Sequence, residues 1–173
     1  MPTIDLQPVL EGELVRLRPT RAGDWDGMFA AASDPLVWEV HPASDRYKEP
    51  VFRRFFDEGL ASGGCLTILD RESGMIIGSS RYHGHDPAAG EIEIGWTFLA
   101  RPYWGGRYNR EVKRLMLGHI YGWIDTVVFL VGDTNIRSRR AMEKIGGRLR
   151  DEIRVRSDIP HLVYEFRRPA LPA

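Results

Sequence analysis

The chain has 173 residues, the length of one ordinary domain, and 43% of them are hydrophobic, which is enough to bury a full core. Its 24 basic and 24 acidic side chains cancel, which excludes a bulk electrostatic attraction to nucleic acid or to a membrane surface. The one cysteine, Cys65, excludes an internal disulfide. Because we find no leader-like start and no apolar run near ~18 residues, we expect a cytoplasmic protein that does not enter the membrane.

The first predicted elements are a strand and two helices. ELVRLRP (13–19) alternates apolar and charged residues, which predicts a strand with one solvated face. Apolar residues spaced like one helical stripe follow at 25–32. Asp34-Pro35 is expected to end that helix, because a residue before proline avoids helical geometry. After a loop through 38–48, a second stripe at 51–60 predicts another helix.

Strands dominate the middle of the chain. CLTILD (65–70) and MIIGSSRY (75–82), joined by the turn RESG, predict a hairpin. A stretch rich in Gly, Pro and Asp at 84–90 leads to EIEIGWTFL (91–99), which predicts a third strand.

The last third alternates helices with strands. An apolar face between 112 and 120 predicts a helix, and VVFLV (127–131) predicts a strand covered on both sides. A last helix around 141–145 is expected to end at Gly146-Gly147. LVYEF (162–166) predicts a final strand, with a further strand near 148–156 left open. We therefore expect a single mixed α/β domain over residues 1–173, with a core at 10–167 and a tail at 168–173.

The segment RPYWGGRYNRE (101–111) carries the clearest functional signal. It follows the predicted strand at 91–99 and runs directly into a regular amphipathic helix. The first N–H groups of a helix have no partner within the helix, and the helix dipole favours negative charge there. The segment therefore predicts a site for a phosphorylated ligand.

Three segments in this order, EIEIGW, YWGGRYNRE and TNIRSRRAMEKIGG (134–147), resemble the GNAT superfamily of N-acetyltransferases. The nearest branch is that of the ribosomal-protein N-terminal acetyltransferases. The resemblance implies a largely antiparallel, mixed sheet of six to seven strands, splayed between its two central strands and flanked by about four helices. It also implies acetyl-CoA as co-substrate and no metal.

The resemblance implies that backbone N–H groups of the loop Trp104–Asn109 hold the CoA pyrophosphate. Arg107 stands where the family prefers glycine, so either its guanidinium contacts a phosphate or the loop has another shape. Asn135 would bind the pantetheine arm and Ser138 would lie near the thioester sulfur, although either residue is also a good helix cap. The expected cofactor-binding residues are Thr97, Phe98, Leu99, Trp104, Gly105, Gly106, Arg107, Tyr108, Asn109, Asn135, Ser138 and Arg140.

The expected catalytic residues are Glu93 and Ser138. A carboxylate at Glu93 would take a proton from the acceptor amine; the alternative is a strand carboxylate with no chemistry. Many family members have a tyrosine that protonates the leaving thiolate, but this chain has Met142 there, so Ser138 or water would serve. Trp38, His41, Arg81 and Tyr82 are expected to form the acceptor wall, with a core role left open for Trp38 and Tyr82.

The function that the resemblance implies is transfer of an acetyl group from acetyl-CoA to a primary amine, by direct attack in a ternary complex. The amine would be a protein N-terminal α-amine or a small molecule. A backbone N–H within 97–99 would stabilise the oxyanion. The alternative is a non-catalytic acyl-CoA sensor or interaction module with the same fold. A homodimer is possible, as in related proteins, whereas nucleic acid and membrane are not expected partners.

Overall fold

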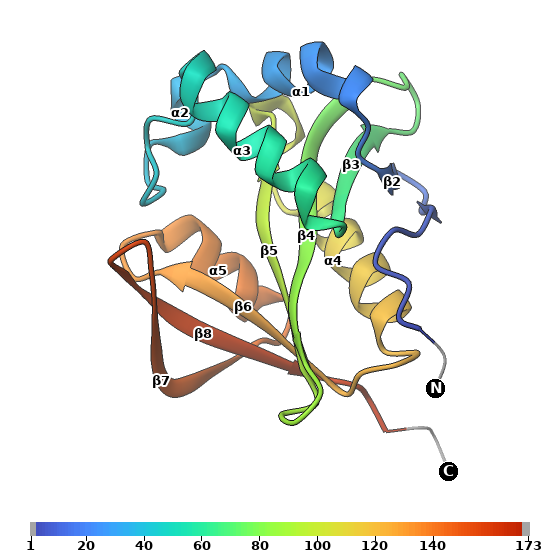
Figure 1. The fold of residues 1–173 in the computed structure, drawn as a ribbon, viewed down its shortest axis with the longest axis vertical. Coiled ribbons are helices and arrows are strands. Elements are labelled where there is room, and N and C mark those ends of the chain that lie inside the picture. Colours follow the sequence, from blue (N-terminus) through green and yellow to red (C-terminus); the bar gives the residue numbers. More distant parts are fainter. Residues whose placement is uncertain (1–2, 171–173) are drawn as a thin grey trace.

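One eight-stranded sheet organises the protein, and helices cover both of its faces (Figure 1). The structure, a computed structural model, describes residues 3–170. Its helices are α1 (Trp25–Ala32), α2 (Pro35–Trp38), α3 (Glu49–Ser62), α4 (Arg107–Ile120) and α5 (Ile136–Lys144), with 3-10 turns at Ala22–Asp24 and Arg101–Tyr103. Its strands are β1 (Leu10–Glu11), β2 (Val15–Pro19), β3 (Cys65–Asp70), β4 (Ile76–Asp86), β5 (Glu91–Leu99), β6 (Thr126–Gly132), β7 (Arg148–Arg156) and β8 (Ile159–Arg167).

The sheet is mixed and largely antiparallel, as the sequence predicted. Its strand order is β1-β2-β3-β4-β5-β6-β8-β7, and β5–β6 is the one parallel pair among the described residues. The described residues form eight strands rather than six to seven, because the short β1 pairs with β2 and the 148–156 segment forms β7. Within residues 3–170, no helix has the length and apolar character needed to cross a membrane.

The two faces of the sheet hold separate apolar cores. One core packs the buried side of α4, with Val112, Met116 and Ile120, and Met142 of α5 against the strands. The other packs α1, α2 and α3 around Trp38 and several phenylalanines. In Figure 1, α3 crosses in front of β4 and β5, whereas α4 lies behind them. Any ligand that enters between strands therefore meets α4 on one side and the α2–α3 layer on the other.

Two short polar segments, Asp34-Pro35 and Asn135, set the starts of helices α2 and α5. The first helix ends at Ala32, but Asp34-Pro35 does more than stop it. The Asp34 carboxylate accepts a hydrogen bond from Leu36 N–H, and Pro35 occupies the first turn, so the pair starts the short helix α2, which ends where the predicted loop 38–48 begins. At α5, the Asn135 side chain accepts from Ser138 N–H at 3.2 Å, which confirms the capping alternative for Asn135.

A carboxylate joins the start of the sheet to α4. Glu111, which is 8% exposed, accepts backbone hydrogen bonds from three consecutive residues, Glu13, Leu14 and Val15, at 2.8–2.9 Å. A Cβ at Gly12 would lie 2.4 Å from the Glu111 carboxyl carbon, so glycine is needed there. These contacts hold β2 against the helix whose N-terminus lies beside the cavity described below.

β5 contains a bulge that changes which way its side chains point. Between the partners Ser79–Arg81 of β4, β5 advances from Phe98 to Gly95, one residue more than β4, and Trp96 has φ +51°. Before the bulge, even-numbered Ile94 faces the α4 core; after it, even-numbered Phe98 faces the α1–α3 core. The bulge therefore turns Thr97 towards α4, where it contacts Lys113.

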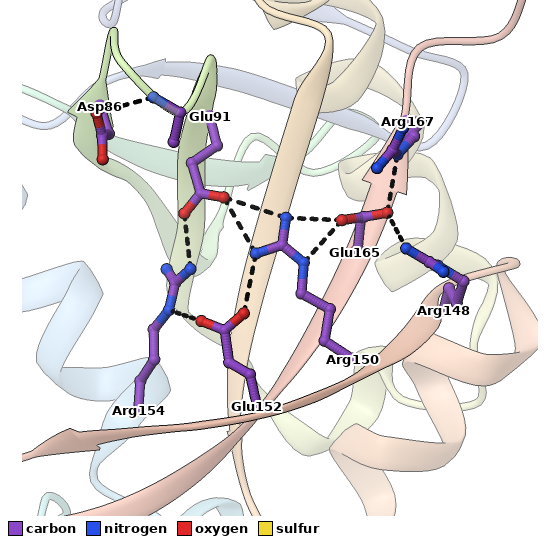
Figure 2. A network of polar contacts seen from close by, with 9 residues as sticks. Asp86, Glu91, Arg148, Arg150, Glu152, Arg154, Glu165 and Arg167 are labelled. Atoms are coloured by element: carbon purple, nitrogen blue, oxygen red, sulfur yellow. Dashed lines mark hydrogen bonds and ion pairs between the residues drawn. The ribbon is translucent and has the colours of Figure 1, made fainter.

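β7 is tied across the sheet by arginine–glutamate pairs (Figure 2). Arg150 contacts Glu91 of β5 and Glu165 of β8, and Arg154 contacts Glu91 at 2.8 Å. Glu165 also accepts from two exposed arginines, Arg148 and Arg167, and Glu152 bridges Arg150 and Arg154. Glu91 and Glu93 lie two residues apart and thus face the same side, where β7 supplies their arginine partners.

Candidate active site

The central strands separate and open a cavity. β5 and β6 are paired only from Glu91↔Thr126 to Glu93↔Val128, although β5 continues to Leu99 and β6 to Gly132. Beyond the last pair, one edge of each strand faces the other across a cavity of about 590 Å³. The N-termini of α4 and α5 also line this cavity, and Val37 and Trp38 of α2 close one side. The predicted splay between the two central strands is present.

The glycine loop at the start of α4 has its positive φ angles at glycines and not at Arg107. Gly105 and Gly106 have φ of +113° and +99°, and a Cβ on either would meet nothing within 4 Å. Arg107 is the first residue of α4, so it has ordinary helical geometry, and Gly106 is the N-cap, with no side-chain cap on the free N–H groups. The left-handed positions therefore fall on the two glycines, which adopt them without strain, and the first N–H groups of α4 have no side-chain cap.

Most of the expected cofactor-binding residues line the cavity. Ten of the twelve do so, all except Arg107 and Tyr108, and Arg110, Arg137 and Lys144 add further positive charge to the same wall. The Arg137 guanidinium lies 3.7 Å from the centroid of the Trp104 ring, so α5 and the glycine loop touch across the cavity. Trp104 Nε1–H also donates to the Leu99 carbonyl, which fixes the indole at the end of β5. These residues form a positive mouth with a narrow, strand-lined interior, which fits a long thioester arm ending in phosphates.

Glu93 lies next to the cavity rather than in its lining. Its carboxylate is held by both terminal nitrogens of Arg156, at 2.9 and 2.5 Å. The lining residue Gly95 separates it from the cavity, and a Cβ at Gly95 would approach Glu93 Oε1 to 2.9 Å. The missing side chain at Gly95 is therefore what leaves room for this carboxylate beside the cavity wall. The catalytic role of Glu93 stays a prediction.

Two of the four expected acceptor residues line the cavity and two do not. Trp38 and His41 line the cavity, and Trp38 is also core, since its Nε1–H donates to the Ala32 carbonyl. Burial, with the charges of Arg46 and His161, lowers the pKa of His41 to about 3, so its imidazole is neutral at pH 7. Its Nδ1 accepts a hydrogen bond from Ala43 N–H at 2.9 Å, and the Arg46 guanidinium lies 3.4 Å from its Nε2.

Arg81 and Tyr82 lie away from the cavity wall. Tyr82 points into the core beneath α4, where its hydroxyl donates to the Met116 carbonyl. Tyr82 is therefore a core residue, the alternative left open above, and not part of the acceptor wall. Arg81 is 4% exposed and stacks on Trp96, with its guanidinium carbon 4.5 Å from the ring centroid. Arg81 therefore contacts a cavity-lining residue, Trp96, without lining the cavity itself. Arg81 and Tyr82 lie on opposite faces of the sheet because successive side chains of a strand alternate.

Lys113 is a cavity residue that sequence reasoning missed. It is buried, lines the cavity and donates from Nζ to Thr97 Oγ1 at 2.7 Å. A signal for it exists in the sequence, because 21 of the 24 basic residues are arginine and Lys113 directly follows buried Val112 in the amphipathic helix. A lysine on that apolar side of an arginine-rich chain is unusual, and lysine is the cation that can lose its proton when buried.

The fold and the cavity together are those of an acyl-CoA-dependent acyltransferase: a sheet that opens between its central strands, with a glycine loop and helix N-terminus at the mouth. A family model described as an acetyltransferase (GNAT) domain matches residues 15–148. The chain belongs to this family of acetyltransferases, whose co-substrate is acetyl-CoA. No curated protein matches the sequence.

Solved structures share the fold. A GCN5-related N-acetyltransferase from Brucella melitensis is 24% identical with a TM-score of 0.75, over 92% of this chain and 77% of its own. An acetyltransferase from Agrobacterium tumefaciens is 27% identical with a TM-score of 0.65, over 93% of this chain and 95% of its own. A Vibrio cholerae structure, whose name proposes a ribosomal-protein-serine acetyltransferase, is 8% identical with a TM-score of 0.75, over 93% and 98%.

Proposed function

We propose that the protein transfers an acetyl group from acetyl-CoA to a primary amine by direct attack in a ternary complex. The observation that carries the proposal is the opening between β5 and β6, with the glycine loop at its mouth and Glu93 beside its wall. The phosphates would bind at Gly105, Gly106 and the first N–H groups of α4, with Arg110 and Arg140 nearby. The acyl arm would run along the free edges of β5 and β6.

In this proposal the free edge of β5 stabilises the oxyanion. A strand that has lost its neighbour leaves backbone N–H groups without partners, and Thr97 and Leu99 follow the bulge at Trp96 on the part of β5 beyond its last pair with β6. Fixed N–H groups in a site that excludes water stabilise a developing negative charge strongly. The carbonyl oxygen of the thioester would become this oxyanion when the amine attacks.

Glu93 is proposed as the base that takes the proton of the acceptor amine, directly or through water. Its Arg156 partner fixes the carboxylate against Gly95, a residue of the cavity lining, so a proton would pass between the cavity and Glu93 at this glycine, directly or through water. Glu93→Gln is expected to lower kcat at neutral pH about 10²-fold, while affinity for CoA stays within about threefold. Glu91→Gln is the matched control, because Glu91 lies on the same face but is held by Arg150 and Arg154 away from the cavity lining.

The experiment that tests the function is release of CoA thiol with a panel of amines, alongside calorimetry with CoA and acetyl-CoA. Peptides with free N-termini and small polyamines represent the two acceptor classes. Amine-dependent thiol release supports acetyl transfer. Binding of acetyl-CoA without turnover would favour the second candidate, an acyl-CoA sensor, which the absence of a tyrosine at Met142 favours. Absence of binding would refute both.

For the acceptor we propose a protein N-terminal α-amine. Support comes from the resemblance of the three sequence segments and from the fold shared with the Vibrio cholerae structure named above. The acceptor side of the cavity is lined by aromatic and neutral groups, Trp38, His41 and Trp96 among them, and a carboxylate cluster that would attract a polyamine does not line it within the described residues. Faster turnover with polyamines than with peptides would contradict this choice. Homodimer formation stays a prediction, which size-exclusion chromatography with light scattering would test.

A further inference from the structure

Lys113 joins the two strands at the point where they separate. Its Nζ lies 2.7 Å from Thr97 Oγ1 on β5 and 4.8 Å from the ring centroid of Phe129 on β6. The side chain rises from α4 and lines the cavity, yet the residue is only 3% exposed. The ammonium therefore lies beneath the opening through which the acyl arm would pass.

This ammonium is not neutralised by an acidic partner. Within residues 3–170 it forms no ion pair, and its polar contact is the neutral Thr97 hydroxyl, which also bonds Ser80. An ammonium has three donors, so the bond to Thr97 uses one of the three. Burial alone lowers the pKa of Lys113 to about 7. The other titratable residues lining the cavity are His41, Tyr103, Arg110, Arg137, Arg140, Lys144 and His161.

We propose that Lys113 is the general acid that protonates the CoA thiolate as it leaves the acetyl group. This role rests on the proposed acetyl transfer and adds to it the source of one proton. The amine nitrogen forms a bond to the carbonyl carbon, the carbon–sulfur bond breaks, and the sulfur takes the bonding pair. Lys113 gives its proton to that sulfur and becomes a neutral amine. The proton lost by the acceptor amine goes to Glu93 or solvent, and Lys113 regains a proton from solvent.

The proton transfer is favourable in direction. An alkyl thiol has a pKa of about 8.5, above that of buried Lys113, so the thiolate is the stronger base. The other candidates are weaker: Met142 carries no transferable proton, and a serine hydroxyl such as Ser138 is a much poorer acid than an ammonium. An arginine at position 113 would keep its proton at any accessible pH.

The kinetic test compares Lys113→Met with Lys48→Met, which removes an exposed lysine at the start of α3. Lys113→Met is expected to lower kcat at pH 7 by about tenfold to 10³-fold, with the Kd for acetyl-CoA within about threefold. The wild-type kcat is expected to fall on the alkaline side as Lys113 loses its proton, and the variant is expected to lack this decline. Lys48→Met should keep the wild-type profile.

A readout independent of turnover follows from the lysine count, since the chain has three lysines, at 48, 113 and 144. Labelling with 13Cε-lysine gives three NMR signals, and the two variants assign Lys113 and Lys48. Lys113 is expected to titrate near pH 7, and its signal should shift on addition of CoA. A Lys113 titration near pH 10 would overturn the proposal, because such an ammonium keeps its proton at neutrality.

The outcomes separate this role from the proposed function. Unchanged kcat in Lys113→Met, with an active wild type, would overturn the acid role and leave acetyl transfer standing. A loss of acetyl-CoA affinity with kcat preserved would make Lys113 a binding residue and would also overturn it. A wild type that turns over no amine would refute the proposed function and the acid role together.

Discussion

Lys113→Met is expected to stabilise the protein, although it removes a hydrogen bond. A lysine whose pKa falls from 10.5 when unfolded to about 7 when folded binds its proton more weakly in the native state. Each unit of difference is about 1.4 kcal/mol, so below pH 7 the ammonium costs about 5 kcal/mol of stability. At pH 7, where half of the native Lys113 is neutral, the cost is about 4 kcal/mol. Methionine has a similar length and needs no hydrogen bond.

The same reasoning predicts how the stability difference between Lys113→Met and wild type changes with pH. Between pH 7 and 10.5 the unfolded state holds more protons at this position, so the cost shrinks as the pH rises, to about 1 kcal/mol at pH 10. Urea unfolding of wild type and Lys113→Met at pH 7, 8.5 and 10 should therefore show a difference that narrows steadily. Other alkaline titrations affect both proteins equally and cancel in the difference.

Two results would refute the reasoning. One is a variant that is no more stable than wild type at pH 7, and the other is a difference that does not narrow towards pH 10. Lys48→Met, at an exposed position, should change stability by less than about 0.5 kcal/mol at every pH. A more stable but less active Lys113→Met would indicate a lysine that is kept for function at the expense of stability.

Three further predictions concern the frame around the site. Glu111→Gln should lower the free energy of unfolding by about 3 kcal/mol, because three backbone N–H groups lose a charged acceptor; exposed Glu11→Gln should change it by less than about 0.5 in the same urea titration. The second prediction concerns Glu165. Burial raises the pKa of its carboxyl group, but hydrogen bonds from neighbouring arginines lower that pKa further, so that it falls from 4.5 to about 2. After allowance for solvent screening, the ionised Glu165 therefore adds about 2 kcal/mol to the free energy of unfolding above pH 4.5, and this stabilisation is lost as the pH falls towards 2. In Glu165→Gln the free energy of unfolding should change less between pH 4.5 and 2 than in the wild type. An equal change in both proteins would contradict the prediction. Gly106→Ala should weaken CoA binding about tenfold in calorimetry, since alanine disfavours φ +99°; Gly63→Ala, at φ +72° outside the cavity, should lower stability and spare binding.

Local sequence determined the elements and the mouth of the site. Stripes of apolar residues gave α1, α3 and α4, because helical periodicity is a property of a few neighbouring residues. The adjacent glycines 105 and 106 take the left-handed positions and Asn135 caps α5, so the local geometry of the two helix starts beside the cavity could be predicted from the sequence. The family resemblance added the largely antiparallel, mixed sheet and the opening between its central pair of strands, whereas the order of the strands came from the structure.

Only the tertiary structure decided what faces the reacting atoms. The bulge at Trp96 reverses the alternation of β5, so Thr97 meets Lys113 across a sequence distance that no local pattern encodes. The position of the Glu93 carboxylate is fixed by Arg156, the last residue of β7, which lies sixty-three residues later in the chain. The protonation of Lys113 depends on how completely the fold excludes water around it, which is a sum over many distant residues. Periodicity and caps are local and readable in advance, whereas burial and register arise only when the whole chain has packed.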